Sequence, residues 1–292
     1  MWRNLSQDEL DWAYDQTQHA ANMQAVLQAC AERSTEVRAT LTAKGLPADR
    51  LAYGELPDEM LDWYASATSV TPAKALVFFI HGGAWRRGLA KENALGIEWM
   101  LAAGIQVVIP DFSSVLQTNG QLQPMLDQIT KAFLFAANKA RPATPIIICG
   151  HSSGAHLAAC LITQLAALNE TSSINGLVLC SGLFDLEPVS RSSRSNYVQF
   201  SENTISKLSP INSPKAFKLP VRIICGTNES PEFMRQSKDF ASVLKQEGTE
   251  VTLTWGKNLN HFEILQTLDL LDGQFSIEIA TLFGVLTETK TT

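Results

Sequence analysis

Gly150-His151-Ser152-Ser153-Gly154 is a G-x-S-x-G pentapeptide that lies between a strand pattern and a helix pattern. The preceding residues, 145–149, form the short apolar run Pro-Ile-Ile-Ile-Cys, which is typical of a fully buried strand. The following residues, 155–162, are mostly small and apolar, as in a helix that packs in a core. In this context the two glycines allow a sharp turn that exposes Ser152 on a strained corner. The stretch therefore predicts a nucleophile elbow, and a plain glycine-rich turn is the alternative.

The composition is that of an ordinary globular chain. Its 292 residues, 45% hydrophobic and 18% charged, are enough to bury a sizeable core in a single α/β domain. The net charge of −6, with lysine and arginine scattered along the chain, argues against a nucleic-acid partner. No apolar run approaches the roughly 18 residues that a membrane span needs, so no membrane partner is expected.

The first residues and the cysteines bear on the cellular compartment. The N-terminal sequence has no apolar segment of the kind found in signal peptides, so secretion by that route is not expected. Five cysteines without C-x-x-C spacing favour free core thiols over a disulfide framework or a zinc site. We therefore expect a protein of the reducing cytoplasm with no metal. A homodimer is compatible with the sequence.

Strand and helix patterns alternate along most of the chain. Strands are expected at 50–54, 60–66, 75–80, 105–110, 145–149, 174–180, 220–225 and 250–255. Helices are expected at 6–18, 22–44, 91–103, 122–140, after the elbow, at 232–246 and at 276–286. This alternation predicts a mainly parallel sheet with helices on both faces, in one domain over residues 1–292 with an N-terminal helical extension at 1–48. The two helices of that extension show no recognisable chemistry.

Residues 183–218 interrupt the alternation. The segment is rich in Ser, Asn and Pro and lies between the strand after the elbow and the next strand. Its position favours a cap or lid over a site, and a solvated excursion is the alternative.

A serine nucleophile needs a base at neutral pH, and the base needs an acid that orients it. In an α/β-hydrolase the chain order is serine, acid, histidine, each in a loop that follows a strand. His261 is the one histidine that follows both the elbow and the late strands, because His19 and His81 precede the elbow and His151 and His156 flank it. His261 is therefore the predicted base.

The acid is expected in the loop after the strand at 220–225. Glu229 lies in the tight part of this loop, three residues past Gly226, and is the predicted acid. Glu232 follows Pro231, where a helix begins, and a carboxylate there stabilises the helix N-terminus. Glu232 remains the second choice.

Acyl transfer also needs N–H donors for the negative charge that develops on the substrate oxygen. His81-Gly82-Gly83-Ala84-Trp85 directly follows the strand at 75–80, where an HGG loop supplies such donors. We expect the oxyanion hole to consist of the N–H groups of Gly82, Gly83 and Ser153. His81 is expected to brace the loop. A turn with two glycines is the alternative.

These residues resemble the kynurenine formamidase (arylformamidase) group of α/β-hydrolases, whose HGGxW motif matches residues 81–85. The resemblance extends over most of the chain beyond about Tyr53. The matching segments are Gly150–Ala158, the SGLFDLEP run at Ser181–Pro188, Leu208-Ser209-Pro210, SPEFMRQS at Ser230–Ser237, and Asn260-His261-Phe262-Glu263.

The resemblance implies hydrolysis of N-formyl-L-kynurenine to L-kynurenine and formate in tryptophan degradation, without a cofactor. It implies that Ser152 is the nucleophile and His261 the base. The family's acid is usually aspartate, and Glu229 stands at that place here. Ala84 also departs from the family, which often has an aromatic residue there, and Phe112 after Asp111 is a further departure.

The substrate is therefore expected to be a small molecule with a formyl group and an aromatic leaving group. Five aromatic residues are candidates to line the wider side of the pocket: Trp85, Phe112, Tyr197, Phe200 and Phe233. Arg191 or Arg194 is a candidate partner for an amino-acid carboxylate, and solvated loop arginines are the alternative.

Two other functions fit the same motifs. A carboxylesterase, or a hydrolase of other aryl amides or carbamates, would use the same three residues, since the choice of substrate lies in the pocket. A ligand-binding protein on this fold would typically lack one of the three, and here none is missing.

Overall fold

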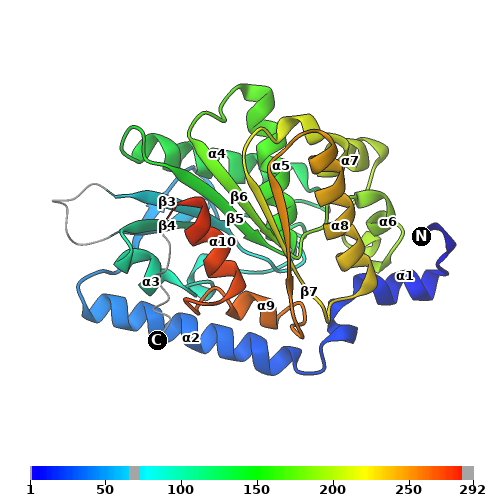
Figure 1. The fold of residues 1–292 in the computed structure, drawn as a ribbon, viewed down its shortest axis with the longest axis horizontal. Helices are drawn as coiled ribbons and strands as arrows, with labels where there is room; N and C mark the ends of the chain where they lie inside the picture. The colour runs from blue at the N-terminus through cyan, green and yellow to red at the C-terminus, as the bar shows by residue number, and fades with distance from the viewer. Residues whose placement is uncertain (1, 66–72, 285–292) are drawn as a thin grey trace.

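The computed structural model describes residues 2–65 and 73–284, which are arranged around a twisted central sheet (Figure 1). In this part of the chain the sheet has eight strands in the order β1-β2-β4-β3-β5-β6-β7-β8. Strand β2 pairs with β1 and β4 in antiparallel fashion, and the other pairs are parallel. The strands are β1 Asp49–Ala52, β2 Met60–Tyr64, β3 Ala75–Ile80, β4 Ile105–Pro110, β5 Ile146–His151, β6 Ile174–Cys180, β7 Val221–Gly226 and β8 Val251–Gly256.

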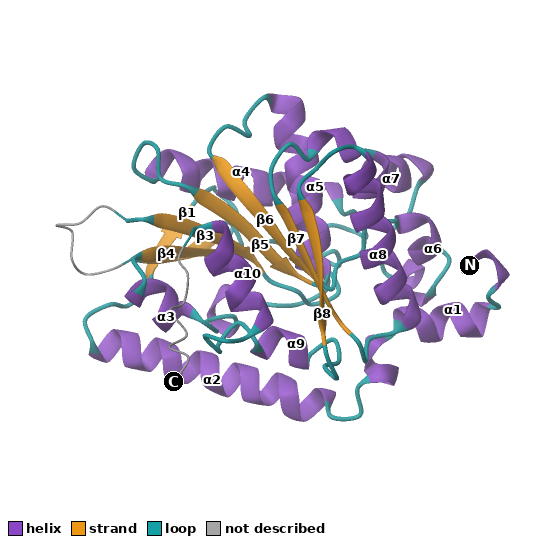
Figure 2. Cartoon of the chain, in the orientation of Figure 1, coloured by secondary structure: helices purple, strands orange, loops and turns teal. Residues whose placement is uncertain are grey.

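Helices cover both faces of this sheet (Figure 2). They are α1 Gln7–Tyr14, α2 Met23–Ala43, α3 Ile97–Ala102, α4 Gln123–Lys139, α5 Ser153–Leu168, α6 Leu186–Ser190, α7 Glu202–Lys207, α8 Pro231–Gln246, α9 Glu263–Gln266 and α10 Gln274–Leu282. The predicted α/β-hydrolase architecture, with a mainly parallel sheet between helical layers, is confirmed.

The central strands are apolar throughout because both of their faces are buried. In β3, Leu76, Phe78 and Ile80 face one hydrophobic core, while Val77 and Phe79 face another. Helices α4, α5 and α8 pack in the first core, and α2, α3 and α10 pack in the second. The long helix α2 runs along one edge of the molecule in Figure 1. This two-sided burial holds the strand ends, and the loops that follow them, in fixed positions.

The N-terminal helices begin and end close to the predicted positions. Ser6 accepts from the N–H of Glu9 and the Glu9 carboxylate accepts from the N–H of Ser6, so the capping box is present. Helix α1 ends at Tyr14, and a short 3₁₀ turn at Gln16–His19 takes over the rest of the range predicted as helix. Gly45 has a φ of +73°, the left-handed conformation in which helices commonly end.

The helix predicted at 91–103 is wrong in extent. Residues Ala90–Glu92 form a 3₁₀ turn, and α3 begins only at Ile97. Gly96 has a φ of +75° and its N–H donates to the Asp269 carboxylate at 2.9 Å, so the chain turns at this point before it becomes helical. Two other predicted elements, at 60–66 and 276–286, end on residues outside the described part.

The segment 183–218 contains α6 and α7 and three 3₁₀ turns, Ser193–Asn196, Pro210–Asn212 and Pro214–Ala216. The side chains of Asp185, Ser192 and Ser201 each accept a hydrogen bond from the first turn that follows, which explains the abundance of short polar residues. The segment packs against the N-terminus, since Arg194 donates to the carbonyl oxygen of Tyr14. Among the described residues, no helix combines the length and the apolar character that crossing a membrane requires.

Candidate active site

Ser152 lies at the turn between β5 and α5. Its φ of +55° and ψ of −123° are unusual for a residue with a side chain, and this strain is the mark of a nucleophile elbow. The two flanking glycines are required by close packing. A Cβ on Gly150 would overlap the carbonyl of Gly154, and a Cβ on Gly154 would overlap the carbonyl of Ile80. The N–H of Ser152 donates to the backbone carbonyl oxygen of Cys180 on the neighbouring strand at 2.8 Å, and this bond fixes the position of the turn.

Three side chains that are far apart in the sequence form one hydrogen-bonded chain. His261 Nε2 lies 2.9 Å from Ser152 Oγ, and His261 Nδ1 lies 2.8 Å from Glu229 Oε2. Ser152 follows β5, Glu229 follows β7 and His261 follows β8, so each lies at the carboxyl end of a parallel strand. The serine hydroxyl can therefore donate to the imidazole while the other ring nitrogen donates to the carboxylate. This is the arrangement of a nucleophile, a base and an orienting acid.

The Glu229 side chain is fully buried, and both of its oxygens accept hydrogen bonds. Oε1 accepts from Ser181 Oγ and, at 2.8 Å, from the N–H of Gly226, while Oε2 faces His261. Burial alone would raise the pKa of Glu229. The facing His261 and the hydrogen bonds from His261, Ser181 and Gly226 outweigh it and hold the pKa below its usual value. The residue is therefore a carboxylate at neutral pH.

His151 supports the loop that carries His261. Its Nε2 lies 2.9 Å from the carbonyl oxygen of His261, so this nitrogen carries the proton and donates. Burial, followed by the nearby His261, lowers the pKa of His151 to about 3, and the ring is neutral at working pH. His151 thus acts as a fixed hydrogen-bond donor.

The loop after β3 lies directly against the elbow. A Cβ added to Gly82 would come within 3.0 Å of the His151 carbonyl oxygen and 3.2 Å of the Ser152 Cβ. Gly83, Ala84 and Trp85 all have positive φ values, of 128°, 54° and 61°, so the loop has a strained and specific shape. His81 Nδ1 lies 2.9 Å from the Gly82 carbonyl, and its ring stacks on Phe112, in keeping with the expected bracing role.

Among the described residues, the three predicted oxyanion donors have no protein acceptor. Within residues 2–65 and 73–284, no hydrogen bond runs from the N–H groups of Gly82, Gly83 or Ser153 to another protein atom. Ser153 is the first residue of α5, where N–H groups are free of intrahelical partners and the helix dipole is positive. These donors are free to bind an oxygen atom of a ligand.

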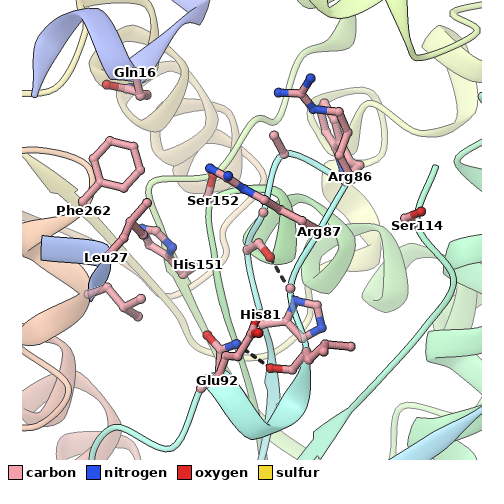
Figure 3. A pocket seen from close by; sticks show the side chains of 18 of the residues that line it. Gln16, Leu27, His81, Arg86, Arg87, Glu92, Ser114, His151, Ser152 and Phe262 are labelled. Carbon is pink, nitrogen blue, oxygen red and sulfur yellow. Dashed lines mark hydrogen bonds between the residues drawn. The ribbon is translucent and has the colours of Figure 1, made fainter. Parts of the chain in front are cut away.

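Ser152 and His261 open onto a cavity of about 990 Å³. Its wall comes from the loop after β3, from the loop after β4, from the 3₁₀ turn at 193–196, and from α9 and the N-terminal segment. Figure 3 shows Ser152 and His151 in the middle of the view, with Arg86 and Arg87 of the loop after β3 to the right and Gln16 and Phe262 to the left.

The structure separates the five predicted pocket aromatics. Trp85, Phe112 and Tyr197 line the cavity, as does Ala84. Phe200 does not; it is half-buried and packs against the first hydrophobic core. Phe233 does not line the cavity either, because its ring is fully buried behind His261, with ring centroids 5.0 Å apart at near right angles. The predictions for Phe200 and Phe233 were wrong for this reason.

The two candidate arginines also differ. Arg191 is exposed, forms an ion pair with Glu187 and lies over the Trp2 ring, away from the cavity. Arg194 is buried and lines the cavity. Glu232, the second choice for the acid, accepts from Tyr14 and Arg235 and does not contact His261.

Sequence reasoning missed the contribution of the N-terminal segment. Tyr14, Gln16 and Leu27 line the cavity, and Gln16 Nε2 lies 3.4 Å from Glu229 Oε2. No local signal in the sequence marks these residues, and the hydrogen-bond partners of Tyr14 and Gln16 lie more than 200 positions away.

Residues 61–244 match the BD-FAE family, which is more than half of the chain. The chain belongs to this family of α/β-hydrolases. Over almost its full length it also resembles the kynurenine formamidase of Salmo salar, at 28% identity over 94% of this chain and 95% of the relative. The kynurenine formamidase of Danio rerio is 27% identical over 91% of this chain and 93% of the relative.

Two solved structures share the fold of this BD-FAE family member. A protein from Silicibacter that is provisionally assigned as a thioesterase superposes with a TM-score of 0.79 at 22% identity, over 92% of this chain and 98% of its own. Esterase B from Lactobacillus rhamnosis gives a TM-score of 0.69 at 16% identity, over 90% of this chain and 96% of its own. At these identities the likeness concerns the fold.

Proposed function

We propose that this chain is a serine hydrolase of aryl formamides, and that it converts N-formyl-L-kynurenine to L-kynurenine and formate. The observation that carries the proposal is the Ser152–His261–Glu229 chain of hydrogen bonds at the edge of a cavity of about 990 Å³. The end-to-end likeness to kynurenine formamidases supports the choice of substrate.

In the first half of the reaction, Ser152 Oγ attacks the formyl carbon while His261 Nε2 takes its proton. The N–H groups of Gly82, Gly83 and Ser153 stabilise the oxyanion, and one such donor is worth about 3 kcal/mol in other hydrolases. The protonated His261 then donates its proton to the aniline nitrogen as the carbon–nitrogen bond breaks. The arylamine leaves and a formyl-serine ester remains.

In the second half, water attacks the formyl-serine ester. His261 removes a proton from this water, and the same N–H groups stabilise the second oxyanion. Collapse returns the proton from His261 to Ser152 Oγ and releases formate. Glu229 keeps the imidazole oriented in both halves and stabilises its charged form.

The walls of the cavity bind the part of the substrate that does not react. Trp85, Phe112 and Tyr197 line the cavity, and we assign them to contact with the aromatic leaving group. Tyr197 belongs to the 183–218 segment, and Ser193, Arg194 and Asn196 of the same segment also line the cavity. This position supports a role for 183–218 as the cap over the leaving-group side.

The proposed reaction belongs to tryptophan degradation in the cytoplasm. All five cysteines are buried, unpaired thiols, which supports a reducing compartment.

The test is a side-by-side measurement of kcat/KM on N-formyl-L-kynurenine and p-nitrophenyl acetate. We expect the formamide to be the better substrate, and Ser152→Ala to abolish turnover of both. A much higher specificity constant for the ester would replace the formamidase with a carboxylesterase that uses the same residues. If wild type and Ser152→Ala both hydrolyse a panel of formanilides and short esters at equal, negligible rates, the proposal that the chain is a hydrolase fails.

A further inference from the structure

Arg194 is a buried arginine in the wall of the cavity. It lies in the 3₁₀ turn Ser193–Asn196 of the 183–218 segment, and only 8% of its surface is exposed. Its guanidinium carbon lies 5.9 Å from the centre of the Phe233 ring, and the same ring contacts the His261 ring at 5.0 Å. One aromatic side chain therefore separates Arg194 from the base.

The guanidinium is held rigidly by neutral partners. Nε and Nη2 donate to the carbonyl oxygen of Tyr14 at 3.2 and 2.9 Å, and Nη1 donates to the Tyr197 hydroxyl at 3.2 Å. The Trp85 ring lies beneath it, 5.5 Å from the guanidinium carbon. A guanidinium has five N–H donors, so one donor on each terminal nitrogen remains after these bonds.

In the described part of the chain Arg194 forms no direct ion pair, and Asp15 interacts with its charge only from beyond ion-pair distance. Within the described ranges, no Asp or Glu oxygen lies within 4.0 Å of Arg194. Arg235, which is partly buried, contacts both Glu232 and Asp239 at 2.7 Å. A buried charge without a counter-ion is costly unless a ligand supplies one. The two free donors on adjacent nitrogens match the two oxygens of a carboxylate.

The surroundings of Arg194 fit an amino-acid tail. Arg86, on the loop after β3, stacks over the Tyr197 ring at 4.3 Å and adds a second cation to this wall, again with no carboxylate within ion-pair distance in the described chain. Asp15 lines the same cavity. Burial opposes its ionisation, but hydrogen bonds from Thr17 and Gln18, together with the charge of Arg194, lower the pKa of Asp15. A carboxylate and an ammonium group of a ligand would therefore find opposite charges close together.

We propose that Arg194 binds the carboxylate of the substrate's tail and so selects aryl formamides whose tail carries a carboxylate over those whose tail lacks one. This inference rests on the proposed formamidase function for its choice of substrate class. Arg194 is a specificity-determining residue in this scheme and takes no part in bond making or breaking.

The kinetic test uses two substrates that differ in one group. N-formyl-L-kynurenine carries the carboxylate, and N-formylkynuramine has hydrogen in its place. Arg194→Met should raise KM for the first by roughly tenfold to a hundredfold, and leave kcat/KM for the second within about twofold. Arg194→Lys keeps the charge without the fork and should fall between wild type and Arg194→Met. Arg191→Met, the matched control outside the cavity, should change neither substrate.

Turnover of N-formylkynuramine shows that each variant is folded. If Arg194→Met does not fold, Arg194→Lys decides, since it must lose part of the preference for the carboxylate. Equal losses on both substrates, or an unchanged preference, would overturn the inference.

A binding measurement separates this inference from the proposed reaction. Calorimetry on the Ser152→Ala protein should show L-kynurenine binding more tightly than kynuramine, with the difference lost in Ser152→Ala/Arg194→Met. If wild type hydrolyses neither formamide but this difference is present, the formamidase assignment fails and the carboxylate site stands. Equal affinities for the two ligands would remove the carboxylate site whatever the enzyme hydrolyses.

Discussion

Ser181 donates a hydrogen bond to the Glu229 oxygen that does not face His261. The N–H of Gly226 donates to the same oxygen, so the carboxylate is held from behind while its other oxygen receives the imidazole. This geometry explains how a glutamate serves where aspartate is usual in the resembling family. The tight turn after β7 brings the acid to His261 despite the additional methylene group.

Replacing Ser181 tests this support. Ser181→Ala removes one of the hydrogen bonds that lower the pKa of Glu229, so the carboxylate protonates at higher pH and the imidazole is held less firmly. We expect kcat to fall by about tenfold at neutral pH, and the acidic limb of its pH profile to move to higher pH. Thr130→Val, which removes another buried hydroxyl within α4, is the control and should shift neither. An unchanged profile in Ser181→Ala would show that Gly226 alone suffices.

The two candidate acids give opposite predictions. Glu229→Gln keeps the shape of the side chain but removes the negative charge beside His261, so kcat should fall by roughly a thousandfold or more. Glu232→Gln weakens contacts with Tyr14 and Arg235 and should cost less than about tenfold. Single-turnover rates on N-formyl-L-kynurenine distinguish the two, and the reverse ranking would reassign the acid.

Gly82 should not tolerate a side chain. In Gly82→Ala the new Cβ would lie 3.0 Å from the His151 carbonyl oxygen and 3.2 Å from the Ser152 Cβ. We expect displacement of the oxyanion donors and a fall in kcat of about a hundredfold, with little change in the unfolding midpoint. Gly248→Ala is the contrasting variant. Its φ is +83° with no atom within 4 Å, so it should cost about 1–2 kcal/mol of stability and no activity.

Buried neutral histidines should make the fold sensitive to acid. Burial lowers the pKa of His151 to about 3 and that of His156 to about 4, and lowers the pKa of His81 as well. In the unfolded chain these groups take up protons near pH 6.5, whereas the folded protein does so only at lower pH. The free energy of unfolding should therefore decrease as the pH falls from about 6.5 towards 4, by up to about 1.4 kcal/mol per pH unit for each histidine.

Urea unfolding between pH 7.5 and pH 5 measures this slope. His156→Gln removes one contributing group, so its stability should depend less steeply on pH than that of wild type. A slope that is the same in both proteins would contradict the assignment of His156 as a buried neutral ring.

The parts of the fold that the sequence predicts well are those decided by local chemistry. The strands at 75–80, 105–110 and 174–180 are short apolar runs between breakers, and the structure has them at the same residues. Ser152, Glu229 and His261 each follow a strand that the sequence predicts. Their convergence at one edge of the sheet could therefore be predicted as well.

Other features depend on distant partners. The helix predicted at 91–103 is broken at Gly96 by an N–H that donates to Asp269, a residue more than 150 positions later. Phe233 is close to the Glu229 loop in sequence, but α8 turns its ring inward against Tyr14 and His261. The role of Gln16 could not be predicted, since nothing near it in the sequence indicates a site.

The contact between Arg194 and the Tyr14 carbonyl joins two segments that each form part of the cavity wall. Neither segment carries the nucleophile, the base or the acid, which all lie at the strand ends. The residues that carry out the reaction and the segments that select the substrate thus lie in different parts of the chain. In a chimera that takes residues 183–218 from a relative, the cavity wall should keep its shape only if the N-terminal segment comes from the same relative, because the two segments pack against each other.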